Sequence, residues 1–354
     1  MRILITGNMG YVGPIVVGHL RRRFPEAELI GYDSGLYSGC LTTPGPVPEA
    51  MLDMQYFGDG RTLPANLLTG VDAVVHLAAI SNDPIGNRFE QVTDEINRGA
   101  SLRLAQLAAE AGVGRFVFAS SCSVYGAAGA AARREGDEVN PLTAYARSKV
   151  MTEQGLAQMP ANGMTVTCLR FATACGMSDR LRLDLVLNDF VACALTSGEI
   201  TVLSDGTPWR PLIDVRDMAR AIEWAVTRPA GNGGDVLIVN VGSDERNHRV
   251  RELAEAVAAA VPGTKVSINP AAPPDARSYR VDFGLFGTLA PEHQPRFSLQ
   301  DSIGALVDGL QAIGFADAGF RSGRMMRLNT LAGLIDAGRL GVDLRWRRAD
   351  LMSA

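Results

Sequence analysis

The chain has 354 residues, of which 47% are hydrophobic and 20% are charged, a composition typical of a globular protein large enough for two domains. Its formal net charge of −4 provides no basic surface, so we expect no nucleic-acid partner. The opening MRILITG lacks the features of a signal peptide, and no apolar run approaches the roughly 18 residues of a membrane span. We therefore expect a cytoplasmic protein without a membrane partner.

Cysteines and histidines indicate neither a disulfide framework nor a metal site. The five cysteines are odd in number and contain no C-x-x-C pair, so we expect reduced, half-buried thiols. The four histidines are scattered without the spacing of metal ligands, and we expect no bound metal.

Short β-branched runs alternate with longer helical patterns in the first half of the chain, as in β-α-β units around a parallel sheet. We expect strands at residues 2–6, 28–32, 72–77, 115–120 and 165–171, and helices at 11–24, 97–111 and 145–158. Prolines and glycines predict that 44–64 is mostly loop.

The pattern changes beyond residue 175. Helices are expected at 184–196 and 217–226, and strands at 200–203 and 236–241, the last of which returns to the main sheet. The predicted plan is an α/β domain over 1–175, joined by later segments near 205–245, and a smaller lobe formed mainly by 176–354.

Three glycines follow the first predicted strand. Gly7, Gly10 and Gly13 form a G-x-x-G-x-x-G pattern that opens a helix. The first glycine permits a tight turn, the second lets the backbone approach a pyrophosphate, and the third lets helix pack on strand, while the helix N-terminus offers N–H groups to phosphates. The spacing alone also fits a plain turn, but its place between strand and helix predicts a Rossmann-type, doubly wound sheet that binds a dinucleotide.

Asp33 ends the second predicted strand, 20 residues after Gly13. A carboxylate there accepts hydrogen bonds from both ribose hydroxyls and repels a 2′-phosphate, which favours NAD over NADP. An aspartate that only caps a turn is the alternative.

Tyr145 and Lys149 lie four positions apart, one turn from each other on a helix face. A phenol with its ordinary pKa of about 10 is a poor base at neutral pH, but a nearby ammonium and an oxidised nicotinamide lower that pKa. Tyr145 could then take a proton from a substrate hydroxyl as hydride leaves for NAD. Ser121 follows the strand at 115–120 and could bind the reacting oxygen. A surface tyrosine–lysine pair is the alternative.

Together these motifs resemble the extended short-chain dehydrogenase/reductase family, in its NAD-dependent sugar-nucleotide epimerase/dehydratase branch. The resemblance runs through TGNMGYVG, HLAAIS, EINRGASLRLAQLA, RFVFASSCSVYG, PLTAYARSKVMTEQ, LRFATACG and GTPWRPLIDVRDMARAI. It implies an α/β fold with a Rossmann-type doubly wound parallel sheet and a smaller C-terminal substrate lobe, NAD as cofactor and a nucleotide-sugar substrate. It also implies a homodimer, in which helices 97–111 and 145–158 pack on their copies in a four-helix bundle.

The resemblance implies roles at matching positions. Ser121, Tyr145 and Lys149 match the catalytic set. Cofactor contacts are implied for Gly7, Gly10, Tyr11, Val12, Gly13, Asp33, Asp59, Leu77, Ala78, Ala79, Asn97, Tyr145 and Lys149. Among these, Asp59 would lie beside the adenine, and Asn97 would fix a strand–loop junction beneath the cofactor. Substrate contacts are implied for Ser121, Thr173, Arg210 and Arg277. The two arginines would bind the diphosphate through bidentate bonds, although either could equally be solvated.

Two departures from the family pattern reduce the number of reactions and substrates that the resemblance allows. The 4,6-dehydratases carry an Asp-Glu pair directly after the catalytic hydroxyl residue, where this chain has Cys122 and Ser123, so dehydration is not expected. Cys122 is interpreted as a small packed residue. Thr173 replaces an asparagine that contacts the sugar in many members, so their substrate cannot be carried over. His76, at a strand end, is interpreted as structural.

We therefore expect an epimerase that transiently oxidises a sugar carbon to a ketone and returns the hydride to the opposite face. A ketoreductase or a decarboxylating oxidoreductase with net turnover of NAD(P) would use the same three residues and is the alternative. A non-enzymatic dinucleotide sensor would typically lack the tyrosine or the lysine, and both are present.

Overall fold

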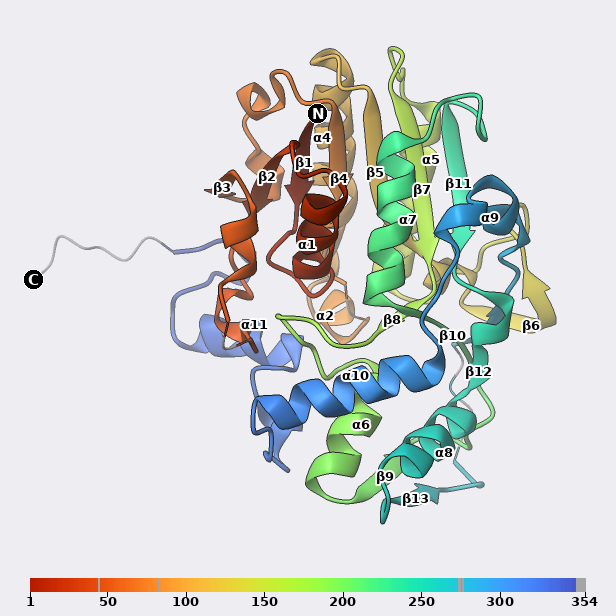
Figure 1. Ribbon diagram of the computed structural model, residues 1–354. Helices are drawn as coiled ribbons and strands as arrows, with labels where there is room; N and C mark the ends of the chain where they lie inside the picture. The colour runs from red at the N-terminus through yellow and green to blue at the C-terminus, as the bar shows by residue number, and fades with distance from the viewer. Residues whose placement is uncertain (44, 82, 273–274, 276, 348–354) are drawn as a thin grey trace, which may run out of the picture.

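The computed structural model describes residues 1–43, 45–81, 83–272, 275 and 277–347. A seven-stranded sheet with the order β11-β7-β5-β4-β1-β2-β3 forms its centre (Figure 1). These strands are β1 (Arg2–Thr6), β2 (Glu28–Asp33), β3 (Met54–Phe57), β4 (Ala73–His76), β5 (Arg115–Ser121), β7 (Thr165–Phe171) and β11 (Val236–Val241). Every pairing in this sheet is parallel, which confirms the predicted doubly wound α/β class.

Helices cover both faces of the sheet because alternate strand side chains point to opposite sides. Ile3 and Ile5 join one apolar cluster, and Leu4 joins another. The first lies under α1 (Gly13–Arg23) and α7 (Val215–Thr227), and the second under α4 (Ala100–Glu110) and α5 (Ala144–Gln158), which Figure 1 shows behind the sheet.

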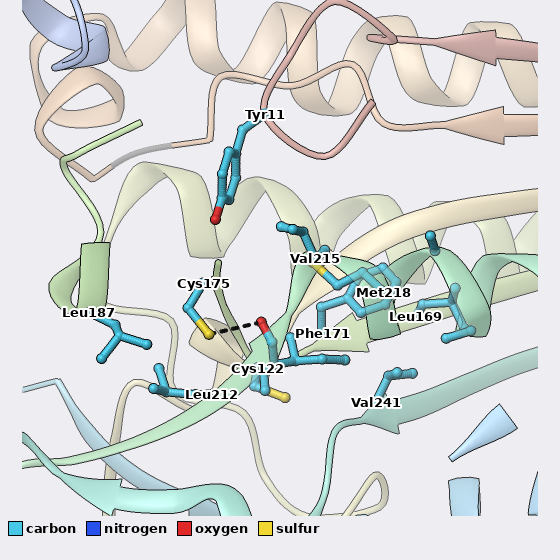
Figure 2. Close-up of a cluster of buried hydrophobic side chains, with 14 of the residues drawn as sticks. Tyr11, Cys122, Leu169, Phe171, Cys175, Leu187, Leu212, Val215, Met218 and Val241 are labelled. Carbon is cyan, nitrogen blue, oxygen red and sulfur yellow. Dashed lines mark hydrogen bonds between the residues drawn. The ribbon is translucent and has the colours of Figure 1, made fainter. Parts of the chain in front are cut away.

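The second half of the chain builds a lobe below the carboxyl edge of the sheet (Figure 1). Its strands and helices are β8 (Thr173–Cys175), β9 (Glu199–Val202), β10 (Trp209–Asp214), β12 (Asn247–Arg249), β13 (Lys265–Ile268), α6 (Val186–Thr196), α8 (Val250–Ala260) and α10 (Leu299–Ala312). The lobe shares a core with the sheet: Figure 2 shows Phe171 and Val241 near Leu187 and Leu212. This shared core holds the two parts together on either side of the strand ends.

The C-terminal segment leaves α10 and returns to the cofactor side of the sheet. There α11 (Arg327–Asp336) packs near α2 (Asp83–Arg88) and α3 (Glu90–Asp94). The other elements are β6 (Ala127–Arg133), β14 (Ser278–Val281), α9 (Gly284–Leu289), the π-helical η5 (Glu95–Gly99), and the 3₁₀ turns η1 (Ser38–Cys40), η2 (Pro48–Met51), η3 (Gly60–Thr62), η4 (Ala65–Leu68), η6 (Cys122–Tyr125), η7 (Asp244–Arg246), η8 (Pro291–His293) and η9 (Phe320–Ser322). No helix in the described ranges is long and apolar enough to cross a membrane.

Several local expectations need correction. Within 44–64, predicted as mostly loop, β3 pairs with β2 as a short edge strand, which the surrounding prolines and glycines hid. The alanine-rich strand β6 pairs with β14 although alanine is a poor strand former. All five cysteines are unpaired, as expected, but they are fully buried rather than half-buried.

Candidate active site

A cavity of about 1040 Å³ lies along the carboxyl ends of the sheet strands and extends into the second lobe, the usual ligand site of an open α/β sheet. Every predicted site residue except Asn97 lines it. These residues are Gly7, Gly10, Tyr11, Val12, Gly13, Asp33, Asp59, Leu77, Ala78, Ala79, Ser121, Tyr145, Lys149, Thr173, Arg210 and Arg277. The fold therefore brings together residues that lie 270 positions apart in the chain (7 to 277).

The turn between β1 and α1 has no room for a side chain at Gly7 or Gly13. Gly7 has a φ of +77°, and a Cβ there would lie 2.4 Å from the backbone nitrogen of Ala78. A Cβ on Gly13 would lie 2.1 Å from the carbonyl oxygen of Asn8. No side chain caps α1 at Val12, and its first turn has no acidic residue. The helix N-terminus thus faces the cavity as a site for phosphate, and these residues fit a dinucleotide.

Two carboxylates stand at the ends of neighbouring strands on the adenosine side. Asp33 accepts hydrogen bonds from the backbone N–H groups of Met9 (3.1 Å) and Gly35 (2.7 Å), which fix its orientation, and burial raises the pKa of its carboxyl group. Asp59 forms a 2.6 Å ion pair with Arg61. Although burial opposes it, this guanidinium lowers the pKa of Asp59.

The predicted catalytic pair lies at the start of α5. Thr143 caps the helix by accepting the N–H of Ala146 at 3.2 Å, so Tyr145 occupies the first turn, where the helix dipole favours negative charge. The Lys149 ammonium lies 5.5 Å from the centroid of the Tyr145 ring. Burial lowers the pKa of Lys149 to about 7.

Ser121 ends β5, and its Oγ accepts the N–H of Ser123 at 3.1 Å, so its hydroxyl proton can serve a ligand. Cys122 turns away into the apolar cluster of Figure 2 and does not line the cavity. Its thiol donates to the carbonyl of Arg170 at 3.1 Å, and burial raises its pKa. The Ser123 hydroxyl lies at the cavity wall, buried and with no hydrogen-bond partner among the residues that the structure describes.

Asn97 supports the cavity from beneath. Its side chain pairs with both backbone groups of Ile80, at 2.7 and 3.0 Å, and donates to Ser148 Oγ at 3.0 Å. It therefore connects the loop after β4 to α5 and acts on the cavity through Ile80, which lines it.

His76 belongs to a buried hydrogen-bond chain. Its Nδ1 lies 2.6 Å from Thr6 Oγ1 and its Nε2 lies 2.7 Å from Ser101 Oγ. Because Ser101 donates its proton to the carbonyl of Asn97, it must accept from Nε2, so this ring nitrogen carries a proton. Burial lowers the pKa of His76 to about 3. No group of three or more histidine, cysteine or acidic side chains in the described part of the chain could hold a metal.

The two predicted phosphate-binding arginines meet at one carboxylate. Arg210 and Arg277 each approach Asp275 to 2.8 Å. The Arg210 side chain is 12% exposed and that of Arg277 is 46% exposed. Each is paired with a carboxylate, and together they bring two guanidinium groups to the part of the cavity that lies in the second lobe.

Sequence reasoning missed several residues that line the cavity. Arg182 pairs with Asp184 at 2.7 Å, both nearly buried, and donates to Ser81 Oγ at 3.0 Å. Arg327 lies over the Tyr37 ring, 4.5 Å from its centroid. Charges alternate with leucines in LRLDL, which is also the pattern of a strand with an exposed charged face, so it did not single out Arg182. Nothing local marked Arg327.

The model of the NAD dependent epimerase/dehydratase family matches residues 3–242. The chain belongs to this family. It is 29% identical to a UDP-glucose 4-epimerase of Azospirillum brasilense, over 77% of this chain and 82% of the relative. It is 26% identical to a dTDP-glucose 4,6-dehydratase of an Actinoplanes strain, over 87% and 97%. Among solved structures, MoeE5 in complex with UDP-glucuronic acid and NAD matches with a TM-score of 0.74 at 24% identity, over 88% of this chain and 99% of that one.

Membership of the epimerase/dehydratase family makes this protein an enzyme with NAD as its cofactor, as the glycine turn and Asp33 predicted. The structural likeness to MoeE5 supports the fold. The relatives include both epimerases and dehydratases. The reaction of this protein therefore has to be inferred from the geometry of its site.

Proposed function

We propose that the protein is a nucleotide-sugar epimerase that oxidises one sugar carbon transiently and then reduces it on the other face. The observation that carries the proposal is the convergence of Ser121, Tyr145 and Lys149 on one cavity that also contains the glycine turn and two arginines. When it is bound, NAD would supply the group that accepts a hydride from the sugar and returns it. The chain's own residues position the sugar and move one proton.

The proton step is assigned to Tyr145. Its phenolate oxygen takes the proton of the reacting hydroxyl, and the resulting phenol gives that proton back when the ketone is reduced. Lys149 stabilises negative charge on that oxygen, and Ser121 donates a hydrogen bond to the reacting oxygen. Since the same proton and the same hydride are returned, no net redox change results.

The wall of the cavity argues against water elimination. Cys122 is buried away from the cavity, and a Ser123 hydroxyl is a weak acid and base at neutral pH. Asp184, in the same cavity, is already paired with Arg182. The two residues directly after Ser121 thus supply no acid–base pair for the removal of water, which favours epimerisation over the dehydratase activity of the Actinoplanes relative.

The part of the cavity that lies in the second lobe supports a nucleoside diphosphate sugar as the substrate. Arg210 and Arg277 project into the cavity from two different segments of the second lobe, and planar guanidinium groups suit bidentate binding of phosphate. Asp275 keeps the two cations together.

The experiment incubates the NAD-loaded protein with UDP-glucose, UDP-glucuronic acid and dTDP-glucose, and follows products by proton NMR and mass spectrometry. We expect one substrate to change configuration at unchanged mass without added NAD, and the Tyr145→Phe variant to lack this activity. Loss of water, loss of carbon dioxide or stoichiometric NADH formation would instead assign a dehydratase, a decarboxylase or a net oxidoreductase.

We also propose a two-fold homodimer through α4 and α5. The two helices pack closely, since a Cβ on Gly155 would lie 2.6 Å from the Leu102 side chain, and Met151 on α5 is 43% exposed. Light scattering at micromolar concentration should give the mass of two chains, and Met151→Glu should shift it toward one. A monomeric wild type contradicts the proposal.

A further inference from the structure

The end of the described chain connects the two loops that flank the adenosine side of the cavity. The Trp346 indole N–H donates to the carbonyl oxygen of Ser34 at 2.6 Å. Arg61 donates to the carbonyl oxygen of Asp343 at 2.9 Å, and Arg345 lies 3.6 Å from Asp59. We call residues 343–346 the C-terminal clasp.

Each contact of the clasp falls next to a residue of the cofactor site. Ser34 directly follows Asp33, the carboxylate at the end of β2, and Asp59 follows β3. All three, together with Arg61, line the cavity. The clasp thus joins the ends of β2 and β3 across the side of the cavity where the adenosine half of a dinucleotide belongs.

An apolar base holds the clasp against the NAD-binding half. Leu344 is 3% exposed and itself lines the cavity. It belongs to a cluster in which Leu331 and Leu340 pack against Ile80 and Ile85 of the sheet domain. A bridge between Leu340 and Trp346 folds the segment back on itself, and Figure 1 shows the C-terminal segment beside β3 and α11 beside α2. The clasp is therefore packed against the NAD-binding half of the protein.

We infer that the C-terminal clasp is a component of the cofactor site that closes its adenosine end and slows dissociation of NAD. Ser34 and Asp59 line the cavity beside Asp33, and the clasp holds the two loops that carry them together. Retention suits an enzyme that recovers its own cofactor in each cycle, and this reason rests on the proposed epimerase function.

The test measures NAD release without any sugar. Full-length protein is loaded with NAD labelled in the nicotinamide, chased with excess unlabelled NAD, and sampled by rapid filtration. The double variant Arg345→Ala, Trp346→Phe removes the ion pair and the indole donor while keeping an aromatic ring at position 346. Val342→Ser is the matched control, because Val342 precedes the clasp and its side chain is 69% exposed.

We expect the double variant to release NAD at least about tenfold faster than wild type, since two or three modest polar contacts together correspond to about that factor. The control should release it at the wild-type rate. A chain ending at Gly338 should be faster still; where it does not fold, the double variant decides alone.

An unchanged release rate in a double variant with a wild-type thermal transition overturns the inference. Because the assay contains no sugar, a failure of the proposed epimerisation leaves this result readable, and slow, clasp-dependent release with a different reaction would overturn only the proposed function.

Discussion

The ammonium group of Lys149 donates a 2.6 Å hydrogen bond to the carbonyl oxygen of Ala119. This bond joins α5 to β5 two residues before Ser121. It therefore fixes the position of the helix that carries Tyr145 relative to the strand that carries Ser121. The ammonium also lies 4.5 Å from the centroid of the Phe118 ring. Lys149 is therefore both an electrostatic partner of Tyr145 and a structural connection within the site.

Replacing Tyr145 by Phe should remove the proton carrier and keep the ring packing. Turnover should fall by roughly 10²–10⁴, the usual contribution of a positioned acid–base group, while NAD affinity stays near wild type. Steady-state kinetics on the nucleotide sugar that the NMR experiment identifies, together with calorimetry of NAD binding, checks this prediction. A near-wild-type rate for the Phe variant would refute the mechanism.

Lys149→Met should damage turnover similarly and should also disturb the site. The methionine cannot donate to the Ala119 carbonyl, which would lose its partner from α5, so we expect weaker NAD binding as well as a lower kcat. Tyr145→Phe is the control, since it leaves this hydrogen bond in place. Equal NAD affinity of the two variants would contradict the structural part of the role.

Asp33 should determine the choice of dinucleotide. A 2′-phosphate would meet a carboxylate already oriented by Met9 and Gly35, so wild type should bind NAD at least about tenfold more tightly than NADP. Asp33→Ser should reduce that ratio by weakening NAD and relieving the repulsion of NADP. Calorimetry with both dinucleotides measures these affinities. Equal affinities of the wild type for NAD and NADP would contradict the prediction.

The two arginines at Asp275 should differ in importance. Loss of a charge-assisted bond corresponds to about 1.5–3 kcal/mol, so Arg210→Lys should raise KM roughly tenfold to a hundredfold with little change in kcat. Arg277→Lys should have a smaller effect because its side chain is 46% exposed against 12% for Arg210. The reverse order of KM values would contradict the placement of Arg210 as the main diphosphate contact.

His76 should make the protein sensitive to acid. Burial holds its folded-state pKa at about 3 against 6.5 for a free histidine, so below about pH 6.5 the unfolded chain binds a proton that the folded chain does not. The free energy of unfolding should therefore fall by about 1.4 kcal/mol per pH unit from this residue alone as the pH drops from 6.5 toward 3.

Urea unfolding across this pH range checks the prediction with His76→Gln. The variant should be less stable than wild type at pH 8, because the ring no longer bridges Thr6 and Ser101, and should lose stability less steeply in acid. Parallel pH profiles for the two proteins would show that His76 is not the source of the slope.

Much of the cofactor and catalytic end could be predicted from the sequence because its requirements are local. A turn with φ of +77° at Gly7, a carboxylate at a strand end, and a tyrosine and lysine one helical turn apart depend on residues close together in the chain. The parallel sheet was predictable for the same reason, since both of its faces are covered and its strands are continuous apolar runs. The exposed edge strand β3 and the alanine-rich β6 carried no such pattern.

Tertiary structure decided whatever depends on distant segments meeting. The ion pair between Asp275 and Arg210 and the bond from Trp346 to Ser34, 312 positions apart, have no local signature. Spacing along the chain constrains side chains only within a few turns of a helix or one strand. The sequence alone thus determined the fold class and predicted the dinucleotide-binding residues and the Ser121–Tyr145–Lys149 set, while the packing of the second lobe and of the C-terminal segment decided which charged side chains line the cavity with them.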